Sequence, residues 1–222
     1  MKDSEHPFYR MPEKEQKHAQ LKVALLAPGL VLLSILPVFL SRWYFIPILS
    51  LAAVITIVAP FFDVPSLKKQ GKLRYFSPLF ITEKESKGVI TIHGGTLLDY
   101  VYVIDRSQMG PERTRFILKC YLLGLIRLIE ELEENPQKNV ILEGTSYIIN
   151  ERTARKIGFE KQKTNWGQTF LLLFNYLNIT ATYSLSKGKL SFPNVNAITT
   201  FRGNSEDVRK RKSYLKELYD KL

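Results

Sequence analysis

Two long apolar runs without a single charge, separated by only two residues, constrain this chain more than any other feature. Residues 23–40 read VALLAPGLVLLSILPVFL and residues 43–62 read WYFIPILSLAAVITIVAPFF. At a rise of about 1.5 Å per residue, each run covers about 27–30 Å, which is the thickness of the hydrocarbon core of a bilayer. The pattern predicts a two-helix transmembrane hairpin, with Arg42, Trp43 and Tyr44 at the interface near its tip.

A signal peptide and a hairpin buried in a soluble core both fit the apolar runs less well. A signal peptide is not preceded by a polar tail such as residues 1–22, and no small-residue cleavage site follows the first run. A hairpin in a soluble core would keep a polar face, and neither run has one. Prolines would kink or shorten the helices, so the hairpin either crosses the bilayer or dips into it: Pro28, Pro37, Pro47 and Pro60.

Cations flank the predicted hairpin on one side. The tail, residues 1–22, and the segment after the hairpin are rich in Lys and Arg, whereas the tip carries Arg42 alone. The positive-inside rule therefore predicts a protein of the cytoplasmic (inner) membrane with both termini in the cytoplasm. The lone Cys120 is then expected to be reduced, and the sequon at Asn178 to be a chance match. Four cations are expected to contact lipid just beyond the hairpin: Lys68, Lys69, Lys72 and Arg74.

Residues 64–222 are long enough for one domain with its own core. The whole chain has 222 residues, with 32 Lys+Arg against 21 Asp+Glu and a formal net charge of +11, and most of this excess lies in the domain. A hydrophobic content of 45% excludes wholesale disorder, and a single Cys excludes an internal disulfide framework.

The pattern of the domain predicts an α+β fold that follows the membrane hairpin. Extended segments are expected over residues 73–81, 88–93, 97–105 and 140–149, with a β-hairpin turn at Gly94-Gly95, and a second hairpin over 180–192. Helices are expected over residues 112–134, from the N-cap Asn150 to Gly158, over 168–178, and as an amphipathic C-terminal helix over 205–222.

The run GTSYIINERTARKIGF, residues 144–159, resembles the closing part of the GNAT acyltransferase fold, where a strand, an Asn-led helix and a Gly-Phe pair precede the next strand. The resemblance covers about residues 88–165, because the expected strand 97–105, helix 112–134 and strand 140–149 follow the GNAT core order. It implies an acyl-CoA pyrophosphate at the start of the long helix. The residues implied to bind it are Arg106, Gly110, Arg113 and Asn150. The loop departs from the family at Pro111, which lacks an N–H, and at Glu112, which is negative.

Strong catalytic signatures are missing: the sequence has no Walker loop, GxGxxG, HExxH or GxSxG motif, and no metal site is expected. His93 and Asp99 are the one close acid/base pair, with His93 as base and Asp99 as its orienting partner, unless each simply caps a turn. Four polar residues cluster around the start of the helix expected at Asn150: Tyr147, Asn150, Glu151 and Arg152.

The sequence leaves three functional hypotheses. The first is a non-catalytic, membrane-anchored protein that faces the cytoplasm, contacts lipid, needs no cofactor, and docks a partner protein or forms a homo-oligomer. The second is a membrane-tethered, GNAT-like acyltransferase or a degenerate relative that binds acyl-CoA. The third is a hairpin-based pore or effector. Nucleic acid is not an expected partner, because the basic stretch in the tail reads as a solvated helix face: Arg202, Arg209, Lys210, Arg211 and Lys212.

Overall fold

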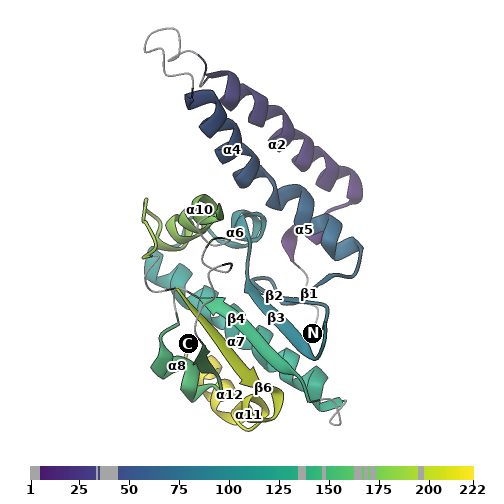
Figure 1. Cartoon of the computed structure of the whole chain (residues 1–222), viewed down its shortest axis with the longest axis vertical. Helices are drawn as coiled ribbons and strands as arrows, with labels where there is room; N and C mark the ends of the chain where they lie inside the picture. The colour runs from purple at the N-terminus through teal and green to yellow at the C-terminus, as the bar shows by residue number, and fades with distance from the viewer. Residues whose placement is uncertain are drawn as a thin grey trace.

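A computed structural model of the chain describes residues 6–33, 35, 45–134, 139–146, 149–162, 167, 170, 174–194 and 198–222. The molecule has two parts (Figure 1). An arm of helices projects from one end of an α+β body, and a short helix, α1 (Pro7–Arg10), precedes the arm. The arm consists of α2 (Glu13–Leu33), α4 (Ile46–Val58) and α5 (Pro60–Lys69).

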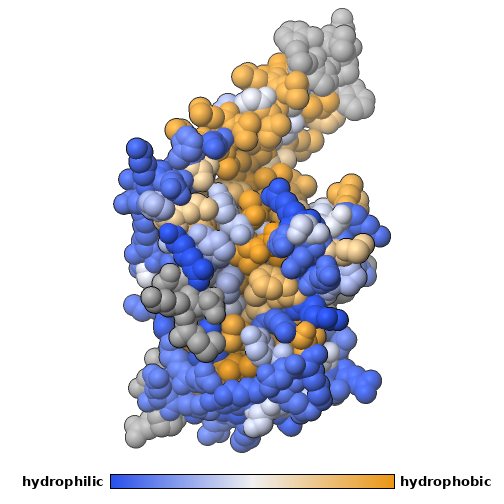
Figure 2. All heavy atoms as spheres, turned by 180° about the vertical axis from the view of Figure 1, so that it is seen from behind, coloured by the Kyte–Doolittle hydropathy of each residue, from blue (hydrophilic) through white to orange (hydrophobic). Residues whose placement is uncertain are grey.

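In the arm, α2 lies beside α4, and both turn apolar side chains outward (Figures 1 and 2). Leu25 and Ile48 are each 69% exposed, for example. Among the described residues, one stretch is long and apolar enough to cross a membrane: Ile46–Lys69, which is α4 and α5 taken together. This stretch has 24 residues, and only 11% of its apolar window is buried.

The expected pair of transmembrane helices is therefore found only in part. The first predicted span, 23–40, does not form a helix of its own, because α2 begins at Glu13 and its first half carries charges. The apolar part of α2 that the structure describes, residues 23–33, rises only about 16 Å. The rest of that span and the predicted tip with Arg42, Trp43 and Tyr44 lie outside the described residues, apart from Ile35.

The body is built on a mixed sheet, six-stranded within the described residues, in the order β1-β2-β3-β4-β6-β5. Only β3 and β4 run parallel, and every other neighbouring pair is antiparallel. The parallel pair is possible because helices carry the chain back between the two strands. The strands are β1 (Leu73–Ser77), β2 (Phe80–Glu83), β3 (Val89–Gly94), β4 (Ile141–Ser146), β5 (Glu160–Gln162) and β6 (Thr199–Asn204).

The long helix α7 (Gly110–Glu134) packs on β1 and β2 and forms the main core with the sheet. Gly124 allows this close packing, because a Cβ built there would meet the Cβ of Phe80 at 2.3 Å. Leu128, Ile129 and Leu142 are almost completely buried between the helix and the sheet. The other helices are α6 (Leu97–Val103), α8 (Glu151–Lys156), α10 (Tyr176–Lys187), α11 (Ser205–Arg209) and α12 (Lys212–Lys221).

The expected α+β class of the domain is confirmed, and so are the long helix and the short helix capped by Asn150. One expected strand and one expected hairpin are wrong. Residues 97–105 form helix α6 rather than a hairpin with β3, because Thr96 and Asp99 close a capping box. Residues 180–192 do not form a hairpin, because α10 continues to Lys187 and Gly188 ends it at a φ of +70°. The C-terminal helix is split into α11 and α12, and much of 168–178 lies outside the described residues.

Candidate functional site at the junction of arm and body

A proline breaks the backbone ladder of the apolar helix where the arm meets the body. Pro60 has no N–H, so the carbonyl of Thr56, four residues earlier, loses its helical partner. Asn178 of α10 supplies a replacement, since its Nδ2 donates to the Thr56 carbonyl at 2.8 Å. Thr56 is the buried residue of α4. The body therefore completes a hydrogen bond that the arm cannot make itself.

A second proline, about one turn further along the helix, also leaves a carbonyl that a side-chain amide satisfies. Pro65 lies inside α5 and leaves the carbonyl of Phe61 without its helical donor. Gln20 of α2 donates to that carbonyl through Nε2 at 2.8 Å. Two side-chain amides, from opposite ends of the sequence, thus satisfy both proline-orphaned carbonyls of the α4–α5 helix. This matters because an unpaired carbonyl shielded from water costs about 1–3 kcal/mol.

A buried carboxylate holds the start of the arm to the body. Asp99 is fully buried, and its Oδ2 accepts from the backbone N–H and the hydroxyl of Thr96, at 2.6 and 2.8 Å. Its Oδ1 accepts from the Tyr75 hydroxyl at 2.7 Å and lies 3.1 Å from Nε2 of His6. The His6 contact is one of proximity rather than a well-aligned hydrogen bond, because Nε2 has no hydrogen-bond partner.

The groups around Asp99 are arranged to face a negative charge. His6 accepts the N–H of Phe8 at Nδ1, so a neutral imidazole carries its proton on Nε2, toward the carboxylate. Burial raises the pKa of Tyr9 to about 12. Burial and the nearby carboxylate raise the pKa of Tyr75 still further, which keeps its hydroxyl a donor. The cluster joins α1, β1 and α6, and its member Tyr75 also lines an open groove on the body.

The start of α7, expected to hold a pyrophosphate, is occupied by the protein itself. The guanidinium of Arg113 donates to three backbone carbonyls, those of Gln108, Leu185 and Arg106, at 2.9, 2.8 and 2.6 Å. A Cβ at Gly110 would lie 2.6 Å from the carbonyl oxygen of Lys187. Glu112 accepts the backbone N–H of Met109. These contacts fasten the end of α10 to the start of α7, so Gly110 serves helix packing rather than close approach of a phosphate.

The remaining predicted site residues are also engaged in protein contacts. His93 lies at the exposed end of β3, where its Nε2 is 2.8 Å from Glu83, so His93 and Asp99 do not form a pair. Asn150 caps α8 by accepting the N–H of Thr153.

Three of the four cations expected to contact lipid have protein partners as well. Lys68 lies 3.7 Å from the centre of the Tyr9 ring, and Lys69 pairs with Glu13 at 3.3 Å. Lys72 is exposed. Arg74 makes a bidentate pair with Glu131, with both N–O distances at 2.6 Å.

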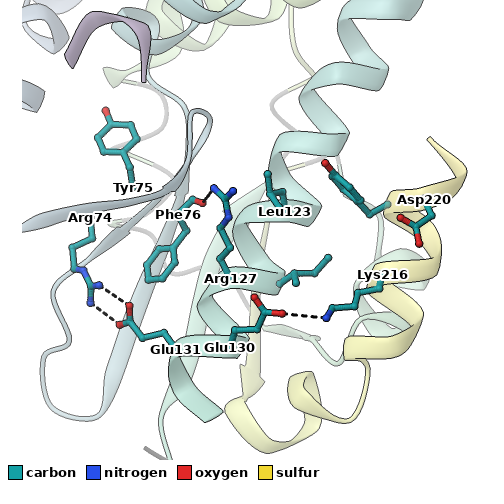
Figure 3. A pocket seen from close by; sticks show the side chains of 11 residues that line it. Arg74, Tyr75, Phe76, Leu123, Arg127, Glu130, Glu131, Lys216 and Asp220 are labelled. Carbon is teal, nitrogen blue, oxygen red and sulfur yellow. Dashed lines mark hydrogen bonds and ion pairs between the residues drawn. The ribbon is translucent and has the colours of Figure 1, made fainter. Parts of the chain in front are cut away.

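An open groove of about 570 Å³ lies on the body between β1, α7 and α12 (Figure 3). Its apolar wall includes Phe76 and Leu123. Charged side chains along it are paired across elements, as in Arg74 with Glu131 and Lys216 with Glu130. Although burial opposes it, the hydrogen bond from Lys216 and the nearby lysine charges hold the pKa of Glu130 below its usual value.

The described residues hold no cluster of His, Cys, Asp and Glu that suits a metal ion. Sequence reasoning missed the two amide–carbonyl contacts and the Asp99 cluster. One signal was available for each: a proline four residues after a carbonyl, and the Thr-x-x-Asp spacing of a capping box. Comparison of the chain with family models, with curated proteins and with solved structures gave no match.

Proposed function

We propose that this chain is a membrane-anchored assembly component that holds its α+β body at the cytoplasmic face of a bilayer. The arm is the anchor, and both termini lie on the cytoplasmic side. Two observations together support the proposal. The apolar side chains of α4 point outward, and the carbonyls of Thr56 and Phe61, which Pro60 and Pro65 leave without helical donors, each accept a side-chain hydrogen bond. Lipid offers no hydrogen bonds, so a kinked helix there needs such internal partners.

The function proposed for the body is to dock another protein in the groove between β1, α7 and α12. The groove is open and its wall is partly apolar (Figure 3). No catalytic role is proposed for it, because Arg74, Glu131, Glu130 and Lys216 are engaged in ion pairs with one another. A second copy of the chain is one outcome of the test below.

Anchoring and docking are tested in the same cells. The full chain should stay in the membrane fraction after alkaline extraction, and a chain with Ile48→Asp and Leu49→Asp should be released. A photoreactive residue at Leu123, in the groove, should crosslink, whereas one at the exposed Arg152 should not. A product of twice the chain's mass identifies a homo-oligomer, and a heavier product containing a second protein identifies a partner. Equal crosslinking at both positions, or none, would contradict docking in the groove.

A GNAT-like acyl-CoA-binding protein is the alternative. It is favoured by one local feature: β4, the Asn150-capped α8, Gly158-Phe159 and β5 follow each other in the order that the resemblance implies. Under this alternative, an acyl-CoA at 100 times its dissociation constant should stabilise the chain by about 2.7 kcal/mol. The Arg106→Ala variant should lose that gain. An unchanged melting temperature with millimolar acyl-CoA would exclude the alternative.

A further inference from the structure

The chain reverses direction at the end of α10 and runs back along the helix. Gly188 adopts a left-handed conformation with φ of +70°, which allows the turn. Ser184 and Ser191 then exchange hydrogen bonds, since the Ser184 hydroxyl donates to the Ser191 carbonyl and accepts its N–H, at 3.1 and 3.0 Å. Residues 189–193 therefore lie alongside α10 rather than extending into solvent.

Large apolar side chains are exposed on both α10 and this returning segment. Leu190 and Phe192 are 74% and 66% exposed, and Phe174, just before α10, and Leu177, in its first turn, are 64% and 42% exposed. The Tyr176 hydroxyl lies 3.5 Å from the Pro193 carbonyl, which brings the returning segment back to the start of the helix. We call these four exposed residues the α10 rim. Leaving so much apolar area in water is unfavourable, so the rim is expected to be covered.

The α10 rim adjoins the apolar surface of the arm. Leu177 precedes Asn178, whose side chain donates to the Thr56 carbonyl of α4. Ile55 and Ile57, on either side of Thr56, are 58% and 37% exposed. Figure 1 shows α10 beside the foot of α4, and Figure 2 shows the apolar surface concentrated toward the arm, with hydrophilic residues over the opposite end of the body.

Two lysines lie next to the α10 rim in sequence. Lys187 and Lys189 flank Gly188 and are both exposed. Lysines beside aromatic and leucine side chains are typical of segments that lie in the headgroup layer of a bilayer, where the ammonium groups meet lipid phosphates. The exposed apolar residues of the α10 rim continue the apolar surface of the arm at the end of the arm that meets the body. A protein partner that covered the rim would not explain this continuity.

We propose that the α10 rim lies in the headgroup layer of the same bilayer that receives the arm. This inference rests on the proposed membrane anchoring. The rim is a second, shallow contact with the membrane, with Leu190 and Phe192 dipping into the upper acyl region and Lys187 and Lys189 reaching the phosphates. Because α10 is also fastened to α4 through Asn178 and to α7 through Arg113, this contact sets the orientation of the whole body on the membrane.

The test uses the full chain reconstituted in vesicles of mixed zwitterionic and anionic lipid. An environment-sensitive fluorophore is attached to Cys introduced by Leu190→Cys, by Ile48→Cys in the arm, or by Glu217→Cys, whose side chain is 60% exposed on α12. The native Cys120 is buried and does not label, which the unsubstituted chain verifies. Quenching is measured with lipids that carry a nitroxide in the headgroup or deep in the acyl chain.

We expect the Leu190 label to be quenched most by the headgroup nitroxide, the Ile48 label most by the deep nitroxide, and the Glu217 label by neither. Replacing both Lys187 and Lys189 by Glu should weaken the quenching at Leu190 and leave that at Ile48 unchanged. If Ile48 is quenched and Leu190 is not, the α10 rim inference is overturned while the anchor stands. If Ile48 is not quenched, the proposed anchoring is wrong. A blue shift at Leu190 without quenching by either nitroxide means that protein covers the rim, which also overturns the inference.

Discussion

In the body, α7 turns leucines and isoleucines toward the sheet and charges toward solvent, whereas in the arm α4 turns the same apolar residues outward. Leu128 and Ile129 of α7 are at most 1% exposed, and Ile48 and Leu49 of α4 are 69% and 61% exposed. The two regions differ in their backbone as well. Beyond its first turn α7 has no proline, whereas Pro60 and Pro65 interrupt the hydrogen-bond ladder of α4 and α5, and Asn178 and Gln20 supply the missing donors. The apolar side chains thus indicate two different surroundings within one chain.

The largest expected effect lies where the two regions meet. Asp99→Ala should lower the free energy of unfolding by about 3–5 kcal/mol, because it leaves the Tyr75 hydroxyl and the Thr96 N–H buried without their acceptor and removes the carboxylate beside His6. Denaturant unfolding of the detergent-solubilised chain measures the change. Asp105→Ala is the matched control, since that carboxylate is exposed and caps only Ser107, so its loss should cost about 0.5 kcal/mol or less. Equal losses would show that the buried cluster does not hold the regions together.

A double-mutant cycle tests whether Asn178 compensates for the hydrogen bond that Pro60 removes. Asn178→Leu should destabilise the chain by about 1–3 kcal/mol, because the Thr56 carbonyl is left without a donor. Pro60→Ala restores a backbone N–H at the position that pairs with Thr56, so adding Asn178→Leu to Pro60→Ala should cost much less. Thermal unfolding of the four proteins gives the coupling. Additive effects would mean that Asn178 does not compensate for the proline.

One substitution made in each region sharpens the contrast in packing. Gly124→Ala in α7 should cost about 1–3 kcal/mol, because the new Cβ would overlap the Cβ of Phe80. Gly29→Ala in α2 meets nothing within 4 Å and should be neutral or stabilise the chain by up to about 1 kcal/mol. Melting temperatures of the two variants in the same detergent provide the measurement. A loss at Gly29 as large as that at Gly124 would place the outer face of α2 against protein.

The smallest effect concerns the thiol in the core of the body. Burial raises the pKa of Cys120 from 9.0 to about 12. The buried, protonated thiol makes its full contribution to the free energy of unfolding below pH 9. That contribution is lost as the pH rises from 9 toward 12, because over this interval the thiol ionises in the unfolded chain and stays protonated in the folded one. From pH 8.5 to pH 10 the free energy of unfolding should fall by about 1 kcal/mol. The Cys120→Ala variant should show a smaller fall over the same interval; an identical fall would assign it to other groups.

Local signals predicted the parts of the fold that depend on neighbours in sequence. The helix over 112–134 follows from its apolar periodicity, and α8 follows from the cap at Asn150 and the left-handed Gly158 at its end. The error at 97–105 arose because LLDYVYVID is rich in residues that favour strands, and the capping box of Thr96 and Asp99 prevails over that preference. Gly188 reads as a hairpin turn in sequence, but the same left-handed conformation also ends a helix.

The candidate site was less accessible to sequence reasoning. Pro60 was expected to kink or shorten its helix, whereas Pro65 was not singled out, and the donors that compensate for both prolines lie elsewhere in the chain. Asn178 is 122 residues from Thr56, and Gln20 is 41 residues from Phe61. Asp99 was singled out for chemistry with His93, whereas tertiary packing places it against His6 and Tyr75. Pairing across such distances depends on the whole fold and leaves no local pattern.

The hydrogen bond between Asn178 and Thr56 also imposes an order on biosynthesis. A ribosome adds about 5–20 residues per second, so the 122 residues between these partners take roughly 6–24 s to make. Through that interval the apolar helix has left the ribosome with one backbone carbonyl still lacking its final donor. The carbonyl of Thr56 can receive this donor only after residue 178 has been translated. The final hydrogen bonding of the apolar helix is therefore decided late, by a residue of the domain outside it.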